Sequence, residues 1–173
     1  WEGSGSPVSS AGDVDGDGLG DLLIGAPNNY YTGNTCKTYL FFGSTVMGGS
    51  TFDLSQADAN FVGEGTGYSA GASASSAGDV DGDGLDDLLI GAYGNDDGGS
   101  TAGKSYLFFG STVASGGSWN LSQADASFVG EASGDASGIS VSSAGDVDGD
   151  GLADLMIGAH LNDDTGSAAG KTY

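Results

Sequence analysis

Aspartates recur at fixed spacing in three short loops of the sequence. Each loop carries aspartates at positions 1, 3, 5 and 9 and a leucine at position 7, with glycines between them. These residues are Asp13, Asp15, Asp17, Leu19 and Asp21; Asp79, Asp81, Asp83, Leu85 and Asp87; and Asp146, Asp148, Asp150, Leu152 and Asp154. Alternate carboxylates on a tightly turned backbone converge on one point, and the glycines permit the turn. Because Ca²⁺ takes about 6–8 oxygen ligands, including backbone carbonyls such as that of the leucine, we expect three calcium sites.

Other interpretations of these loops fit less well. Mg²⁺ seldom uses a cage made only of protein ligands, and zinc would require His or Cys, which the loops lack. An EF-hand needs a Glu at position 12, where this chain has Ile24, Ile90 and Ile157 in apolar segments. Solvated acidic turns without metal remain an alternative, but four carboxylates within nine residues repel one another strongly when no cation is bound.

The charge of the whole chain also indicates cation binding. Among 173 residues, 24 are acidic and three are Lys or Arg, which gives a formal net charge of −21. This imbalance excludes nucleic acid as a partner and opposes compaction unless cations neutralise it. Acidic disorder is the alternative, but dense blocks of Leu, Ile, Val and Phe argue against it. No apolar run is long enough to span a membrane.

Internal repetition indicates how the loops are positioned. The segment Ala-Gly-Asp-Val-Asp-Gly-Asp-Gly-Leu begins at Ala11, Ala77 and Ala144, at intervals of 66 and 67 residues. The segments that begin at Thr38 and Ser55 recur 67 residues later. A repeat of this length, rich in short apolar runs and turn residues, predicts an all-β fold of β-propeller blades with four antiparallel strands each. We expect one blade in residues 1–61, a second in 62–128 and a third in 129–173.

The strands of each blade follow from local patterns. A first strand rich in Ser, Ala and Gly precedes each aspartate loop, where only small side chains fit between converging blades. Short apolar runs at 21–26, 87–92 and 154–159 predict buried second strands. Aromatic-rich third strands are expected at 39–42 and 106–109, and short fourth strands at 60–64 and 127–131. No segment shows a convincing helical stripe, although residues 52–58 could form one turn.

The residues that carry this pattern resemble the FG-GAP repeat of integrin α-subunit propellers and of many bacterial surface or secreted proteins. Gly25-Ala26-Pro27 reproduces the "GAP" element, whereas the other two copies lack its proline. The "FG" element is weaker, with Gly71-Ala72 and Gly138-Ile139 at the corresponding places. The resemblance implies that a structural calcium ion is bound in the loop between the first two strands of each blade.

Blade topology separates these loops from a candidate ligand surface. If the aspartate loops join strands one and two, the two–three and four–one connections lie on the opposite face. In integrins, to which the resemblance points, that opposite face meets the ligand. Loops on a rigid scaffold often carry binding residues. The candidates for contact with a protein or glycan ligand are Asn28, Asn29, Tyr30, Tyr31 and Tyr93, which could equally be simple exposed turn residues.

These observations favour a non-enzymatic, calcium-stabilised binding or adhesion module located outside the cell or at its surface. No pair of nucleophile and base is visible in the sequence. Fewer than three blades make a partial propeller, unless further copies of the chain complete it. One alternative function is therefore a self-assembling structural repeat of a surface layer or fibre. An accessory scaffold of a larger secreted enzyme is the other.

Overall fold

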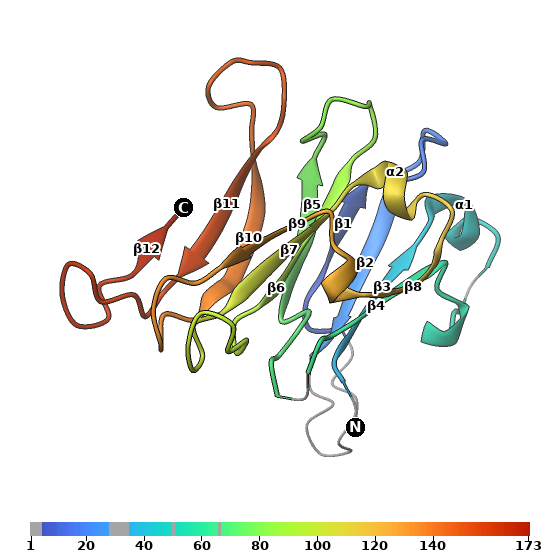
Figure 1. Ribbon diagram of the computed structural model, residues 1–173. Helices are drawn as coiled ribbons and strands as arrows, with labels where there is room; N and C mark the ends of the chain where they lie inside the picture. Colours follow the sequence, from blue (N-terminus) through green and yellow to red (C-terminus); the bar gives the residue numbers. More distant parts are fainter. Residues whose placement is uncertain (1–4, 28–34, 50, 66) are drawn as a thin grey trace.

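A computed structural model describes residues 5–27, 35–49, 51–65 and 67–173. The described chain is built almost entirely of β-sheet (Figure 1). The first sheet contains β1 (Val8–Gly12), β2 (Asp21–Ala26), β3 (Lys37–Phe41), β4 (Ala59–Val62) and β8 (Gly117–Asn120). The second contains β5 (Ser73–Gly78), β6 (Asp87–Ala92), β7 (Lys104–Phe108) and β9 (Ala126–Val129). The third contains β10 (Ser137–Gly145), β11 (Asp154–Ala159) and β12 (Lys171–Thr172).

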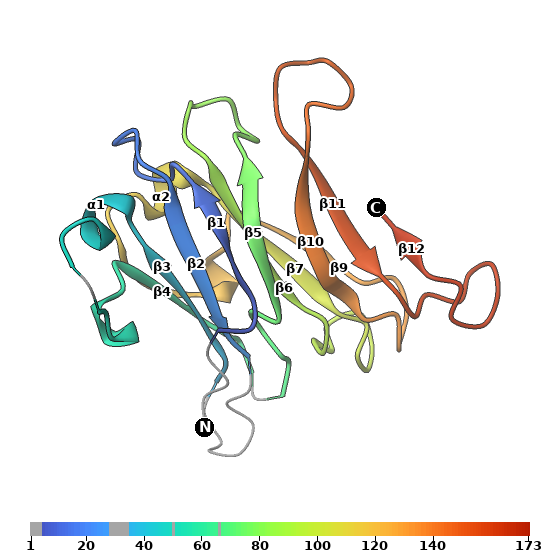
Figure 2. The same ribbon diagram turned by 180° about the vertical axis from the view of Figure 1, so that it is seen from behind.

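Apart from β8, which joins the first sheet in parallel, each sheet is an antiparallel meander, and the three sheets stand side by side (Figures 1 and 2). Among the first strands, β5 lies between β1 and β10 and contacts both, in keeping with the small residues in these strands (Figure 2). The sheets do not close into a ring. The fold is therefore all-β, with propeller blades that form part of a propeller.

Close approach of neighbouring blades explains the small residues near the first strands. Ser73 in β5 donates a hydrogen bond from Oγ to the carbonyl of Gly138, at 2.7 Å. A Cβ atom added to Gly91 in β6 would collide with that same carbonyl. Glycine is therefore required in β6 at the point where the backbone of the next blade approaches.

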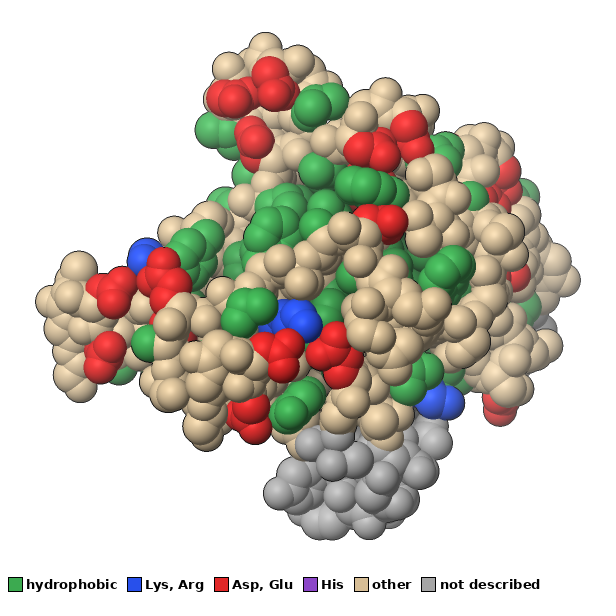
Figure 3. Space-filling model, viewed as in Figure 1, with side chains coloured by type: hydrophobic (Ala, Val, Ile, Leu, Met, Phe, Trp, Pro, Cys, Tyr) green, Lys and Arg blue, Asp and Glu red, His purple; other side chains and the backbone are tan. Residues whose placement is uncertain are grey.

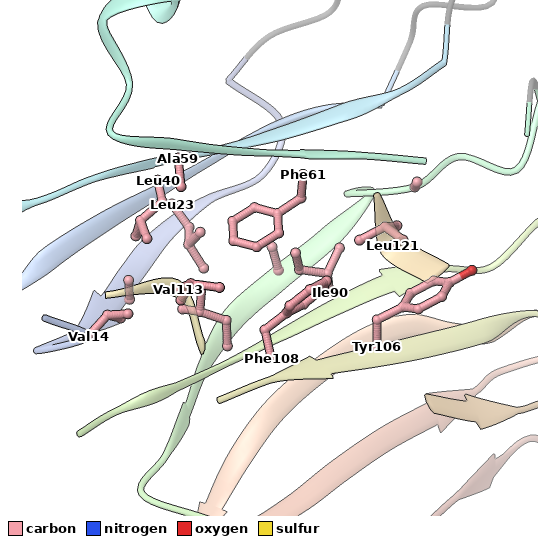
Figure 4. Packing of buried hydrophobic residues seen from close by; sticks show 14 of the residues in the cluster. Val14, Leu23, Leu40, Ala59, Phe61, Ile90, Tyr106, Phe108, Val113 and Leu121 are labelled. Atoms are coloured by element: carbon pink, nitrogen blue, oxygen red, sulfur yellow. The ribbon is translucent and has the colours of Figure 1, made fainter. Parts of the chain in front are cut away.

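The main hydrophobic core lies between the first two blades (Figure 4). Phe61 of β4 and Phe108 of β7 pack with ring centroids 4.9 Å apart, and Trp119 of β8 packs edge-on to Phe108 at 6.5 Å. Phe61 and Phe108 are almost completely buried. Each such burial is worth roughly 1.5–3 kcal/mol, so side chains from two repeats stabilise one shared core.

The structure adjusts several predicted boundaries. The third strands begin at Lys37 and Lys104, two residues earlier than predicted, because Lys stays in register with the preceding strand. The fourth strands end at Val62 and Val129, where Gly63 and Gly130 bond instead to carbonyls of other loops. The turn expected within residues 52–58 is the 3₁₀ helix η2 (Leu54–Gln56), which is capped by Asp53. An equivalent 3₁₀ helix, η3 (Leu121–Gln123), occurs in the next repeat.

Strand β8 and the short helices α1 (Gly43–Val46) and α2 (Gly110–Val113) were not predicted. Strand β8 belongs by sequence to the second blade but pairs in parallel with β4 of the first. Phe61 lies beside Trp119 in this pairing. The partner of β8 is distant in the sequence and four residues show no clear period, so local pattern could not reveal the strand.

Candidate metal centre

The three aspartate loops connect β1 to β2, β5 to β6 and β10 to β11. All three project from the same side of the molecule, and acidic side chains mark their tips in the space-filling view (Figures 1 and 3). The connections from β6 to β7 and from β11 to β12 leave from the opposite side (Figure 1). The fold therefore collects negative charge along one edge and separates it from the other set of connections.

Within each loop the structure brings three carboxylates together, with one oxygen of each within 4.8 Å of the others. The groups are Asp13, Asp15 and Asp17; Asp79, Asp81 and Asp87; and Asp146, Asp148 and Asp154. The first group uses positions 1, 3 and 5, whereas the other two use positions 1, 3 and 9. Asp21, Asp83 and Asp150 were predicted as ligands but do not belong to these groups.

The loop backbone holds the first aspartate in place. Asp13 accepts hydrogen bonds from the amides of Gly16 at 2.9 Å and Gly18 at 3.0 Å, one at each carboxylate oxygen. Both glycines have positive φ, at 75° and 85°, a conformation that other residues rarely adopt. The same bonds recur around Asp79 and Asp146. The glycines therefore shape the turn that aims the carboxylates at one point.

The ninth-position aspartate is the most buried member of the loop. Asp87 accepts hydrogen bonds from the amides of Val80 and Gly110, both at 2.8 Å. Burial raises the pKa of Asp87, and the nearby carboxylate of Asp81 raises it further, against the opposing effect of the two amides. Burial raises the pKa of Asp21 in the same way. These carboxylates therefore join the loop to the helix that follows the third strand and are poorly solvated when no cation is near.

The first and second loops are each hydrogen-bonded to the loop of the next blade. The amide of Asp86 donates to the carbonyl of Asp13 at 3.0 Å, and the amide of Ala153 donates to the carbonyl of Asp79 at 2.8 Å. Asp86 adds a side-chain bond, since its carboxylate accepts from the amide of Asp13 at 2.8 Å. The valine at position 2 of the loop is buried in the first repeat but not in the third. Val14 is 0% exposed, whereas Val147 is 73% exposed.

The donor set fits a hard cation. Every clustered donor is a carboxylate oxygen, and among the described residues no His or Cys belongs to such a group. Three carboxylates held this close repel one another, and a divalent ion would relieve that repulsion. The leucine carbonyls of Leu19, Leu85 and Leu152 remain predicted ligands. The chemistry that these loops can perform is the binding of a cation.

The predicted ligand contacts Asn28, Asn29, Tyr30 and Tyr31 lie outside the described residues. Tyr93 is half-buried in the turn after β6. A nearby ion-pair network between blades was not predicted. Lys104 lies 2.8 Å from Asp97 and 3.4 Å from Glu64 of the preceding blade, and its ammonium stands over the Tyr106 ring.

The same arrangement recurs in the next repeat, where Lys171 pairs with Glu131 and Asp164. The signal that could have revealed it is the recurrence of both Glu and Lys at 67 residues. Burial opposes protonation of Lys104, but Asp97 and Glu64 outweigh it and raise the pKa of the ammonium. Glu64, Glu131, Asp97 and Asp164 thus serve contacts within and between blades.

Comparison with known families agrees with this geometry. The FG-GAP repeat model matches residues 7–35, 70–108 and 137–173, which together make up more than half of the chain. The protein therefore belongs to the FG-GAP repeat family, whose members commonly bind Ca²⁺. It is also similar to integrin alpha-4 of Xenopus laevis, with 31% identity over 157 residues. That match covers 88% of this chain but 14% of the integrin's length.

A membrane-spanning helix is not found in the part of the chain that the structure describes: no helix there is both long and apolar enough.

Proposed function

We propose that this chain is a non-enzymatic, calcium-stabilised binding module that acts outside the cell or at its surface. The observation that carries the proposal is the recurrence of one acidic cluster in the same loop of each blade. The family match and the similarity to an integrin α-subunit support an adhesion role. The role of the clusters is structural rather than catalytic, because their first-position carboxylates accept hydrogen bonds from the loop backbone.

Ca²⁺ in each loop would be held by the clustered aspartates, with the remaining aspartate of the set and the leucine carbonyl as further ligands. The bound ion would neutralise the loop and fix the turn between the first two strands. Since each loop is bonded to its neighbour, calcium in one loop would also stabilise the contact between blades. The connections on the opposite side would remain free to contact a protein or glycan ligand.

Substitution of the third-position aspartates tests the assignment of the metal ligands. Asp15, Asp81 and Asp148 belong to the clustered groups in all three loops. Asp81→Asn keeps an oxygen that can accept the 3.1 Å hydrogen bond from the amide of Asp83 but removes the negative charge. We expect each Asn variant to remove one calcium equivalent in a titration calorimetry experiment and to lower the melting temperature only when calcium is present.

The matched control is Asp163→Asn, which changes an exposed aspartate in the turn after β11. It should leave the calcium stoichiometry unchanged. Equal destabilisation of the Asp81 variant with and without calcium would show that the loop carboxylates act only through their turn hydrogen bonds, and the assignment would then be wrong.

A further inference from the structure

The two equivalent fourth strands differ in what covers them. On its outer edge, β4 is paired in parallel with β8 over four residues, from Ala59↔Gly117 to Val62↔Asn120. Strand β9 is the counterpart of β4 in the second blade, and among the described residues it pairs only with β7. Its outer edge therefore presents unpaired backbone donors and acceptors, with which another strand can pair.

Equivalent side chains of β4 and β9 also differ in their exposure to solvent. Phe61 in β4 is 1% exposed, whereas its counterpart Phe128 in β9 is 38% exposed. Val129, the counterpart of Val62, is 46% exposed. In the first pair of blades the ring of Phe61 is covered by Phe108, and Leu121 and Trp119 belong to the same cluster. The sequence of β9 thus retains the apolar residues of a covered strand, but the cover is missing from the described chain.

A hollow lies beside this edge. A cavity of about 330 Å³ is lined by Phe128, Val129, Glu131, Ser137, Ile157 and Tyr173. The lining comes from β9, from the loop that follows it and from the strands of the third blade. In the space-filling view hydrophobic side chains gather over this region, between the second and third blades (Figure 3). The cavity is therefore bordered by the exposed Phe128 and Val129 of this edge.

We propose that the outer edge of β9 is a docking site for one extended segment of a further repeat of the same type, added in parallel. Its pattern would be that of residues 117–121, Gly-Ser-Trp-Asn-Leu. The described structure shows what such a segment does: β8 pairs with β4, the amide of Gly117 donates to Asp58 at 2.8 Å, and Leu121 is buried in the shared core. Asp125 is the counterpart of Asp58 and stands at the same place before β9.

Strand addition at this edge would account for the crossing of β8 from the second blade to the first. Each blade receives its outermost strand from the repeat that follows, so neighbouring blades are joined by backbone hydrogen bonds as well as by side chains. This mode of addition gives affinity through the main chain and selectivity through alternate side chains. The aromatic residue would enter the hollow next to Phe128, and the edge pairing does not depend on metal.

An extended chain tests the docking site without a separate ligand. Tyr173 corresponds to Tyr106, so a copy of residues 107–124 placed after Tyr173 continues the repeat and supplies a second copy of β8. With calcium present in all samples, amide hydrogen exchange in residues 126–129 should slow at least tenfold relative to the parent chain. The control carries Ser118→Pro and Trp119→Gly in the appended copy only, and its exchange in residues 126–129 should remain several times faster than that of the unsubstituted extended chain.

Two further measurements keep the outcome decisive. A free peptide of residues 115–124 added to the parent chain should slow the same amides, and the peptide with Trp119→Gly should not. Unchanged exchange in both the extended chain and the peptide experiment would overturn the proposal. Concentration-dependent protection of β9 in the parent chain, with doubling of its mass, would also overturn it, because a second whole copy would then be the occupant.

Discussion

The carboxylate of Asp86 accepts a hydrogen bond from the amide of Asp13, at 2.8 Å, while the amide of Asp86 donates to the carbonyl of Asp13 at 3.0 Å. This reciprocal pair joins the first aspartate of one loop to the loop of the next blade. The third repeat has Ala153 at the place of Asp86 and retains only the backbone bond to Asp79. Neighbouring loops are thus linked by hydrogen bonds.

Loss of the Asp86 side chain should loosen the first loop. We expect Asp86→Ala to lower the free energy of unfolding by about 1–2 kcal/mol in calcium, because the bond pairs a charged acceptor with a partly buried amide. Asp86→Asn should cost less, since its side-chain oxygen can still accept. Urea unfolding in calcium measures both. If the Ala variant is as stable as the parent, the side-chain hydrogen bond between the loops does not contribute to the free energy of unfolding.

The buried lysine between blades should be worth more than its exposed counterpart. Lys104→Met leaves Glu64 and Asp97 without their cation, and we expect a loss of about 2–3 kcal/mol. Lys171→Met, in which the lost ion pairs are solvent-exposed, should cost clearly less than Lys104→Met. Denaturant unfolding of both variants makes the comparison. Equal losses would mean that burial does not strengthen the network around Lys104.

The pH range of the lysine contribution follows from the direction of its pKa shift. The folded-state pKa of Lys104 is raised above its usual value of 10.5, so the folded state binds the proton more tightly than the unfolded chain does. The stabilisation is complete below the unfolded pKa and is lost as the pH rises through the folded pKa. The Lys104→Met penalty should therefore be constant from pH 6 to about pH 9, measured by denaturant unfolding at each pH.

Two equivalent phenylalanines provide a test of the shared core. Phe61→Ala removes a side chain packed against Phe108 and should cost about 3–5 kcal/mol. Phe128→Ala removes its exposed counterpart and should cost less than about 1 kcal/mol. Thermal unfolding of the two variants checks the difference. A similar loss of stability for both variants would contradict the finding that Phe128 of β9 is only partly buried.

Acid should affect the calcium-free and calcium-loaded protein in opposite directions. Burial raises the folded-state pKa of Asp21 and Asp87, so the metal-free folded state binds protons more readily than the unfolded chain and gains stability as the pH falls toward those pKa values. Calcium would oppose protonation of the same groups. The melting temperature should therefore rise in calcium-free buffer as the pH is lowered toward the raised pKa values of these two carboxyl groups, and it should fall in calcium over the same pH range.

Much of the fold was visible in local sequence. The recurring aspartates and glycines fixed the position of each first loop, and the short apolar runs marked the second strands because burial imposes hydrophobic residues there. Strand β8 and the pairing of Glu64 with Lys104 were missed for one reason. Both depend on contacts between repeats, and such contacts leave no pattern within a single short segment.

The candidate site was predicted in part for a similar reason. Asp15 and Asp81 could be placed in a cluster from spacing alone, since the turn is local. Spacing alone did not show that the first cluster takes the fifth-position Asp17 whereas the second takes the ninth-position Asp87. The residues in the range 28–34 lie outside the described structure, and the predicted ligand contacts there remain predictions.

The central claim is that the aspartate loops hold calcium and that calcium stabilises the blades. Paired thermal melts, with calcium and with excess chelator, test it most directly when light scattering records the mass. Calcium at about a hundred times its dissociation constant should add roughly 2.7 kcal/mol per independent site, with the mass unchanged. The melting temperature should then rise clearly in calcium. Identical melts in calcium and chelator would contradict the account, because the loops would then be acidic turns that hold no metal.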